Sequence, residues 1–201
     1  MTRWYKEKKK EYFYNEAKRR GYRSRSAFKL KQIQNKFKII KETDFVLDLG
    51  AAPGGWCQVI HELVRGNGKI IGVDLLNIKP IDDIRFIQDD ITKRSVIKKI
   101  IDIAGENEFD VIVSDISPNI SGNYSIDHAK SIHLCKQSLK LVDELLKKNG
   151  NFLCKIFMGE EFEDFLNFFK KKFKNVRIFS PPASRKSSSE IYLIGKKYIK
   201  L

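Results

Sequence analysis

The sequence predicts an α/β fold in which helices cover a largely parallel β-sheet. Short runs of apolar, often β-branched residues alternate with amphipathic stretches from Asp44 onward, and this alternation is typical of a parallel sheet with helical crossovers. A glycine-rich turn joins the first apolar run directly to the first amphipathic stretch. At 201 residues, of which 42% are apolar, the chain is long enough for one hydrophobic core and short for two independent domains.

Seven apolar runs fit strands, because each is short and ends near a polar or glycine-rich segment. They are residues 45–49, 69–73, 85–88, 111–114, 151–157, 176–179 and 191–195. Four stretches between them fit helices: 55–64, 92–103, 127–148 and 160–173. The third helix is the longest, and Asn149 and Gly150 supply its C-terminal stop. In the fourth, phenylalanines recur at helical spacing and are expected in the core: Phe162, Phe165, Phe168, Phe169 and Phe173.

Two loops of the predicted fold are candidates for a functional site. Residues 117–125 form a turn-rich segment, and residues 180–189 form a loop of Pro, Ser, Arg and Lys. Because α/β folds bind ligands at the carboxyl ends of their strands, both loops are expected near a site.

The positive charge of the chain is concentrated at its N-terminus. Residues 1–41 hold 15 Lys and Arg against 3 Glu, whereas the rest holds 24 basic against 22 acidic residues. We therefore divide the chain into a basic extension, 1–41, and a nearly neutral domain, 42–201. A basic block with interleaved aromatic residues favours contact with a nucleic acid, and the alternative is a solvated lysine-rich helix that aids solubility. Acidic residues within the block disfavour a membrane-surface helix or a targeting presequence: Glu7, Glu11 and Glu16.

Several other functional classes are disfavoured by the sequence. No apolar run is long enough to span a membrane, and the N-terminus lacks the apolar core of a secretory signal. The three cysteines stand alone in apolar stretches, which fits buried thiols in a reducing compartment better than disulfides. The three histidines have no zinc-ligand spacing with them, so no metal site is expected.

A cofactor loop is predicted after the first strand, where residues 48–56 read DLGAAPGGW and lead straight into a helix. Small residues allow the backbone to approach a ligand closely. The next strand ends at Asp74, whose carboxylate is placed to accept both ribose hydroxyls of an adenosine. The third strand leads into Asp89 and Asp90, near which an adenine amine is expected. A dinucleotide oxidoreductase is the rival interpretation, but the loop lacks a G-x-G-x-x-G pattern and contains a proline.

Six segments cover, in order, nearly the whole chain after about residue 20: 22–30 (YRSRSAFKL), 48–56 (DLGAAPGGW), 72–76 (GVDLL), 114–119 (SDISPN), 154–157 (CKIF) and 187–192 (SSSEIY). Together they resemble the FtsJ/RrmJ-type ribosomal RNA ribose 2′-O-methyltransferases, the RlmE family. The resemblance implies a Rossmann-like methyltransferase fold with seven mostly parallel strands, helices on both faces and an antiparallel last strand. It also implies that S-adenosylmethionine (SAM) is the cofactor.

The resemblance further implies where the functional residues lie. The family's Lys-Asp-Lys-Glu tetrad falls on Lys29, Asp115, Lys155 and Glu190. The predicted cofactor site comprises Gly50, Ala51, Pro53, Gly54, Gly55, Trp56, Asp74, Leu75, Asp89, Asp90, Ile91 and Asp115. Basic residues in the N-terminal extension and in the loop 180–189 are the candidate RNA contacts: Arg23, Arg25, Arg185 and Lys186.

The implied substrate is a uridine ribose in large-subunit ribosomal RNA. The GAAPGGW and DLL segments resemble the ribosomal-RNA branch, whereas tRNA-modifying members tend toward CAAPGSW. A tRNA ribose methyltransferase and a non-catalytic ribosome-assembly factor of the same fold are the alternatives. The expected state is a monomer that binds RNA within a large subunit, without membrane or metal. The expected location is a reducing, intracellular one: the cytoplasm of a bacterium, or an organelle such as the mitochondrion or the nucleus of a eukaryote.

A mechanism follows from the tetrad as a hypothesis. Lys155, with a pKa lowered by partial burial and by the charge of Lys29, accepts the proton of the ribose hydroxyl, while Asp115 and Glu190 orient it. In the competing hypothesis Lys155 stays charged and stabilises the developing alkoxide.

Plainer interpretations remain open for single residues. Trp56 is as well suited to packing the first helix on the sheet as to contacting the cofactor. Asp90 is also suited to an ordinary role near a helix N-terminus, with Thr92 beside it. Each of the four candidate RNA contacts is also compatible with a solvated surface position.

Overall fold

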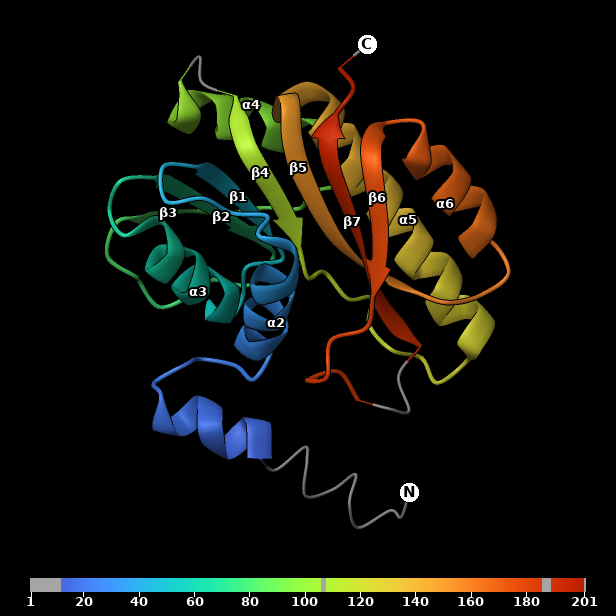
Figure 1. Ribbon diagram of the computed structural model, residues 1–201, viewed down its shortest axis with the longest axis horizontal. Coiled ribbons are helices and arrows are strands. Elements are labelled where there is room, and N and C mark those ends of the chain that lie inside the picture. The colour runs from blue at the N-terminus through green and yellow to red at the C-terminus, as the bar shows by residue number, and fades with distance from the viewer. Residues whose placement is uncertain (1–11, 106–107, 186–188, 201) are drawn as a thin grey trace.

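One seven-stranded sheet organises the computed structural model, which describes residues 12–105, 108–185 and 189–200 (Figure 1). The strands are β1 (Phe45–Leu49), β2 (Lys69–Asp74), β3 (Ile84–Gln88), β4 (Phe109–Ser114), β5 (Leu146–Phe157), β6 (Phe173–Phe179) and β7 (Glu190–Tyr198). The helices are α2 (Ala27–Phe37), α3 (Gly55–Val64), α4 (Arg94–Ala104), α5 (Tyr124–Leu145) and α6 (Phe162–Lys170). Residues 12–19 form a further helical segment.

The strand order is β3-β2-β1-β4-β5-β7-β6. Strands β1 to β5 pair in parallel, whereas β7 is antiparallel to both of its neighbours, which confirms the mostly parallel sheet and the antiparallel last strand. Because the chain order reverses between β1 and β4, a crevice is expected beyond their carboxyl ends.

Helices cover both faces of the sheet, as predicted (Figure 1). Helices α4, α5 and α6 pack on one face and form one core cluster with it, while α2 and α3 form a second cluster on the other face. The apolar side chains of central strands such as β1 are buried on both faces, which is why they lack an alternating pattern.

Residues 27–40, within the predicted extension, supply side chains to the second cluster. Leu30 and Ile33 are fully buried, and Ile39 and Ile40 are nearly so. The chain turns sharply after α2, and the side-chain amide of Gln34 binds both backbone N–H groups of residues 39 and 40 and the carbonyl of Ile40. The division of the chain at residue 41 remains a prediction, but α2 contributes to the core.

Two predicted helix ends were wrong. Helix α5 ends at Leu145, and the segment expected to finish it belongs to β5. Leu146 is fully buried opposite Phe109 of β4, so packing overrides the helical pattern, and Asn149 adopts a positive φ of 66° within the strand. Helix α6 ends at Lys170, and Phe173 opens β6 instead.

The phenylalanines of this region are buried except one. Phe162, Phe165, Phe169 and Phe173 lie in the first core cluster, as expected, whereas Phe168 is 48% exposed. The prediction for Phe168 was wrong because this side chain lies on the side of α6 that faces away from the core.

The predictions for cysteines agree with the structure. Cys57, Cys135 and Cys154 are free and buried. Within the described part of the chain, no helix combines the length and apolar character that crossing a membrane requires.

Candidate active site

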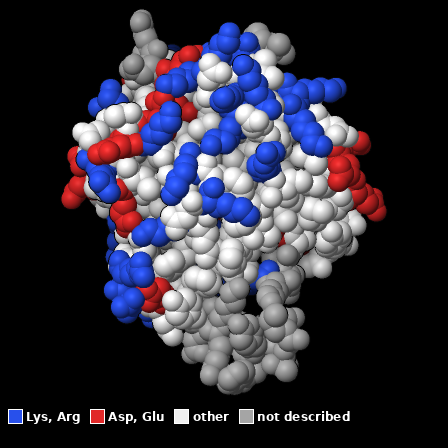
Figure 2. Space-filling model, viewed as in Figure 1, with Lys and Arg blue, Asp and Glu red and all other residues white. Residues whose placement is uncertain are grey.

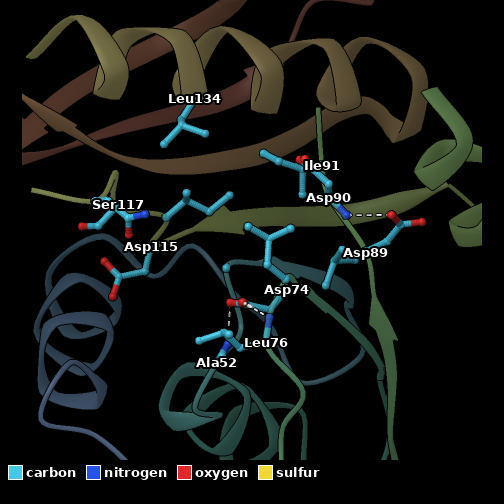
Figure 3. A pocket seen from close by; sticks show the side chains of 14 residues that line it. Ala52, Asp74, Leu76, Asp89, Asp90, Ile91, Asp115, Ser117 and Leu134 are labelled. Atoms are coloured by element: carbon cyan, nitrogen blue, oxygen red, sulfur yellow. Dashed lines mark hydrogen bonds between the residues drawn. The ribbon is translucent and has the colours of Figure 1, made fainter. Parts of the chain in front are cut away.

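A cavity of about 430 Å³ lies at the carboxyl ends of β1, β2 and β4 (Figure 3). This volume is in the range of small-molecule sites. Loops that follow strands supply most of the lining, and one side chain comes from α5. The lining residues are Gly50, Ala52, Val73, Asp74, Leu75, Leu76, Asp89, Asp90, Ile91, Asp115, Ile116, Ser117, Asn119 and Leu134.

The chemistry of the lining selects for a cationic nucleoside. Four aspartates line a cavity whose other walls are largely apolar. A pyrophosphate would meet these carboxylates with unfavourable charge, whereas a sulfonium or an amine would be attracted. The arrangement therefore disfavours a dinucleotide and suits SAM.

Asp74 is held rigidly at the end of β2. One carboxylate oxygen accepts a hydrogen bond from the N–H of Ala52 at 2.9 Å, and the other accepts from the N–H of Leu76 at 2.9 Å (Figure 3). Each oxygen has a second lone pair, so the carboxylate can still accept ribose hydroxyls.

Asp89 and Asp90 are fixed by local partners. The hydrogen bond from Lys99, at 2.6 Å, holds the pKa of the Asp89 carboxyl below its usual value. The N–H and the hydroxyl of Thr92 do the same for the pKa of Asp90, at 2.9 and 2.8 Å. Asp90 therefore stabilises the turn before α4 through Thr92, and it also lines the cavity.

The predicted cofactor residues fall into two groups. Gly50, Leu75 and Ile91 line the cavity together with the four aspartates. The remaining predicted residues are absent from the described lining: Ala51, Pro53, Gly54, Gly55 and Trp56.

The two adjacent glycines allow residues 23–24 to approach the start of α3. A Cβ on Gly54 would lie 2.9 Å from the Arg23 guanidinium, and a Cβ on Gly55 would lie 2.2 Å from the Ser24 hydroxyl. Gly54 also has a φ of 109°, which other residues rarely adopt. The small residues of the turn therefore serve packing of the protein on itself as well as access to the cavity.

Trp56 packs inside the protein. Its side chain is buried, its indole N–H donates to the carbonyl of Ser26 at 2.9 Å, and its ring stacks on Tyr192 with centroids 5.9 Å apart. Of the two interpretations that the sequence left open, this geometry favours packing.

Four residues far apart in sequence meet beside the cavity. The Lys29 ammonium lies 2.7 Å from a Glu190 carboxylate oxygen, and the Lys155 ammonium lies 3.0 Å from an Asp115 oxygen. All four side chains are at most 14% exposed. Because Asp115 also lines the cavity, it joins the ion pairs to the predicted cofactor site.

The charges of the cluster lower the pKa of the Asp115 carboxyl. Burial works to raise the pKa of this carboxyl, but the charges of Lys155 and Lys29 and hydrogen bonds from Tyr192 and Lys155 lower it below its usual value. Asp115 is therefore ionised at neutral pH.

Tyr192 is a fifth member of the cluster that sequence reasoning missed. It is fully buried, and its hydroxyl donates to Asp115 at 2.7 Å. Burial, followed by the charges of Asp115 and Glu190, raises the pKa of this hydroxyl well above its usual value, so it remains a donor. Its position two residues after Glu190, on the same face of a strand, was the available signal.

The predicted RNA contacts lie in different settings. Arg23 binds backbone carbonyls, with 2.8 Å to that of Pro80. Arg25 is half-buried, and burial followed by the charge of Arg185 lowers its pKa. Arg185 is exposed, and Lys186 lies outside the described residues.

Comparison with known proteins agrees with this geometry. The family described as FtsJ-like methyltransferase matches residues 22–198. The ribosomal RNA large subunit methyltransferase E of Methanosarcina mazei is 50% identical over 191 residues, which cover 95% of this chain and 70% of that protein. The protein of the same name from Methanocaldococcus jannaschii is 46% identical over 200 residues, which cover 98% and 82%.

Solved structures are also similar. A ribosomal RNA methyltransferase from Plasmodium falciparum superposes with a TM-score of 0.83 at 32% identity, covering 90% of this chain and 100% of that one. Fibrillarin from Aeropyrum pernix with natively bound SAM has a TM-score of 0.59 at 16% identity, covering 87% and 75%, and shows the fold alone.

Proposed function

The chain belongs to the FtsJ-like methyltransferase family, and from this premise we propose that it transfers a methyl group from SAM to the 2′-hydroxyl of a ribose in RNA. The proposed target is a uridine of large-subunit ribosomal RNA. The observation that carries the proposal is Asp115, which borders the cavity and also anchors the cluster of Lys29, Lys155 and Glu190.

The cavity fits SAM through groups of this chain. Asp74 is positioned to accept the ribose hydroxyls, Asp89, Asp90 and Ile91 form a wall for the adenine, and the carboxylate of Asp115 favours the positive charge of the sulfonium side. Bound there, SAM would supply the methyl group. Leu134 and Ile116 add apolar surface to the lining, which would exclude water from the surface of a bound ligand.

Lys155, once its ammonium group has lost a proton to solvent, is the proposed acceptor for the proton of the ribose hydroxyl. Its amine is held by the side chain of Asp115 at 3.0 Å and by the carbonyl of the same residue. Glu190 pairs with Lys29 at 2.7 Å and so holds the second amine of the cluster in place. Tyr192 donates to the same Asp115 oxygen as Lys155 and keeps that carboxylate in place.

Substituting Lys155 tests this role. We expect Lys155→Met and Lys155→Arg both to lower single-turnover methylation at least a hundredfold, because guanidinium stays protonated and cannot accept a proton. SAM binding, measured by calorimetry, should stay within threefold. Near-normal turnover of Lys155→Arg would instead assign Lys155 to electrostatic stabilisation of the alkoxide.

The choice of RNA as substrate rests on the relatives and on charge. Lys and Arg side chains gather on the face that holds β5, β6 and β7, and acidic side chains lie toward its margins (Figure 2). Mapping ribose methylation in ribosomal RNA with wild type and the Lys155→Met variant tests both substrate and position. Methylation of tRNA alone would redirect the proposal to the tRNA branch, and binding of NAD without SAM would overturn it.

A further inference from the structure

Several large apolar side chains are exposed around the candidate active site. Leu75 and Leu76, at the rim of the cavity, are 63% and 69% exposed. Further exposed apolar side chains belong to the loop after β4, to the start of α5 and to the residue after β5: Ile120, Tyr124, Ile126 and Met158. Exposed apolar groups that gather beside a site mark an interaction surface rather than a solvated one.

Tyr124 and Met158 form one unit within this region. The Tyr124 hydroxyl donates to the carbonyl of Met158 at 2.6 Å. The tyrosine is nevertheless 59% exposed and the methionine 40%. The hydroxyl therefore fixes the ring while most of its surface stays open.

The backbone beneath this unit is anchored. The Asp127 carboxylate accepts hydrogen bonds from the N–H and hydroxyl of Ser121 and from the N–H of Gly122, which locks the loop before α5. The His128 ring contacts the carbonyl of Phe157 at 2.9 Å and the N–H of Glu161 at 3.1 Å. The start of α5 and the segment after β5 are thus held together by buried groups, and Tyr124 and Met158 do not have to be ordered on binding.

The unit adjoins the ion-pair cluster. The N–H of Met158 donates to the carbonyl of Ser189, directly before Glu190. Met158 also follows Lys155 by three residues on an extended chain, a separation of about 10 Å. A nucleobase projects several ångströms from its own ribose, and the base stacked on it lies about 3.4 Å further along the strand. A nucleotide whose ribose lies against Lys155 therefore has its own base, or a neighbouring one, within reach of the Tyr124 ring.

We propose that Tyr124 and Met158 form a stacking platform for a nucleobase of the substrate RNA, either that of the target nucleotide or that of its immediate neighbour. The proposal rests on the proposed function and deepens it. An aromatic ring offers a flat apolar surface that every base can stack on, and single-stranded RNA is commonly recognised in this way. The platform holds the base, so that the ribose of the same strand is presented to the cluster.

Three variants of Tyr124 separate stacking from other roles. Stacking on an aromatic ring contributes about 1–3 kcal/mol per base, which corresponds to roughly 5- to 150-fold in affinity. We expect Tyr124→Ala and Tyr124→Leu to weaken binding of a target RNA fragment at least fivefold, and Tyr124→Phe to stay within threefold of wild type. SAM binding should be unchanged in all three. The control is Phe168→Ala, which removes an aromatic side chain of similar exposure from α6.

RNA with an abasic residue at the target or neighbouring position completes the test. Wild type should bind one of these abasic RNAs as weakly as Tyr124→Ala binds the complete RNA. The Tyr124→Ala variant should bind that abasic RNA and the complete RNA with equal affinity. Equal affinity of Tyr124→Ala and wild type for complete RNA would overturn the platform, as would full activity of Tyr124→Leu. If the wild type binds but does not methylate RNA, the proposed function fails while the affinities still decide on the platform.

Discussion

Arg23 connects two loops that flank the cavity. Its guanidinium donates to the carbonyls of Lys79 and Pro80, in the loop after β2, and more weakly to that of Pro53 in the turn after β1, at 3.4 Å. A planar group with several fixed donors can bridge separate carbonyls, which an ammonium cannot do with the same geometry. The donors of Arg23 are therefore used within the protein, and we interpret it as a positioning residue for the cofactor site.

We expect Arg23→Lys and Arg23→Ala to weaken SAM binding about tenfold, because hydrogen bonds to a charged group contribute about 1.5–3 kcal/mol and this site is partly exposed. Calorimetry with SAM measures the effect. The control is Arg185→Ala, which removes an exposed arginine and should leave SAM binding unchanged. Loss of RNA affinity with normal SAM affinity in the Arg23 variants would restore the phosphate-contact interpretation.

The buried carboxyl of Asp48 is expected to make the stability of the folded protein depend on pH. It is fully buried on β1, one carboxylate oxygen accepts from the Cys57 thiol at 3.1 Å, and the other has no partner among the described residues. Burial raises its pKa from 3.8 to about 7, and nearby Asp115 and Asp74 add to this, although the thiol opposes it. The bound proton stabilises the folded state fully below pH 3.8, and this contribution is lost as the pH rises to about 7.

We expect the free energy of unfolding of wild type to fall by roughly 2–4 kcal/mol from this group between pH 4.5 and 8. Asp48→Asn should flatten the dependence, because an amide does not titrate. Urea unfolding at several pH values measures it, with exposed Asp102→Asn as the control. Parallel pH profiles for wild type and Asp48→Asn would show that Asp48 is ionised in the folded state.

At the residue scale, the sequence indicates a role most directly where a residue type has few uses in its setting. A lysine in an apolar run, as at Lys155, and an aspartate at a strand end, as at Asp74, stand out in the sequence, and the structure brings Lys155 to Asp115 and Asp74 to the cavity. Trp56 and Arg23 have equally good uses in packing and hydrogen bonding, and only their three-dimensional partners distinguish these. Tyr192 was missed because a tyrosine in an apolar strand is indistinguishable by pattern from ordinary core.

At the scale of elements, α2 links the core to the ion-pair cluster. Lys29 and Leu30 are successive residues of this helix, one paired with Glu190 and the other fully buried against the sheet. The packing of α2 against the sheet therefore also fixes the position of the Lys29 amine. A helix that supplies both core and cluster is expected to unfold with the sheet rather than before it.

We expect Ile33→Ala to lower the free energy of unfolding by about 2–5 kcal/mol, because it leaves a cavity at a fully buried position of α2. The loss should appear in the single transition of the whole chain, followed by circular dichroism in denaturant. Asn35→Ala, at an exposed position of the same helix, should change stability by no more than about 0.5 kcal/mol. Separate melting of α2, with the sheet unaffected, would support the predicted boundary at residue 41.

Two predicted helix ends were wrong where tertiary pairing competes with a local pattern, and helix α2, within the basic extension, was not predicted. The run that continues α5 past Leu145 has helical periodicity, yet Leu146 pairs with β4 and starts a strand. Phe173 likewise continues the spacing of α6, but it packs beneath Gly195 of β7, where a Cβ would lie 2.5 Å from its ring. Strand partners that are distant in sequence decide both boundaries, and no local pattern contains them.

At the scale of the whole molecule, charge is separated. Carboxylates gather in the cavity, whereas basic side chains spread over the face of β5, β7 and β6 (Figure 2). We define the basic stripe as Lys36, Lys38, Arg177 and Lys196. Lys36 lies 4.5 Å from the ring of Phe179 on β6, Lys196 donates to the carbonyl of Phe37, and Arg177 stands opposite Ile194, on the face that α2 covers.

The basic stripe is continuous with the cluster through two elements. Lys36 follows Lys29 by seven residues on α2, about 10 Å along the helix axis, and Lys196 follows Glu190 by six residues on β7, about 20 Å. Among the described residues, no member of the stripe forms an ion pair with a carboxylate, so its charge is available. An RNA strand whose target ribose lies at Lys155 would place neighbouring phosphates along these residues.

Neutralising the basic stripe should therefore weaken RNA binding in a salt-dependent way. Each phosphate contact on single-stranded RNA contributes about 0.7 to the slope of log affinity against log salt concentration. We expect the triple variant Lys36→Gln, Lys38→Asn and Arg177→Gln to lower that slope by about 2 and to raise Kd for RNA at least tenfold at low salt. Asn at residue 38 tolerates the positive φ found there. SAM binding and single-turnover methylation at saturating RNA should be preserved, because none of the three residues lies in the cavity or the cluster.

The matched control neutralises Lys98, Lys140 and Lys170, three exposed lysines of α4, α5 and α6, the helices that cover the opposite face. An equal change of slope in both triple variants would mean that net charge, and not the basic stripe, attracts the RNA.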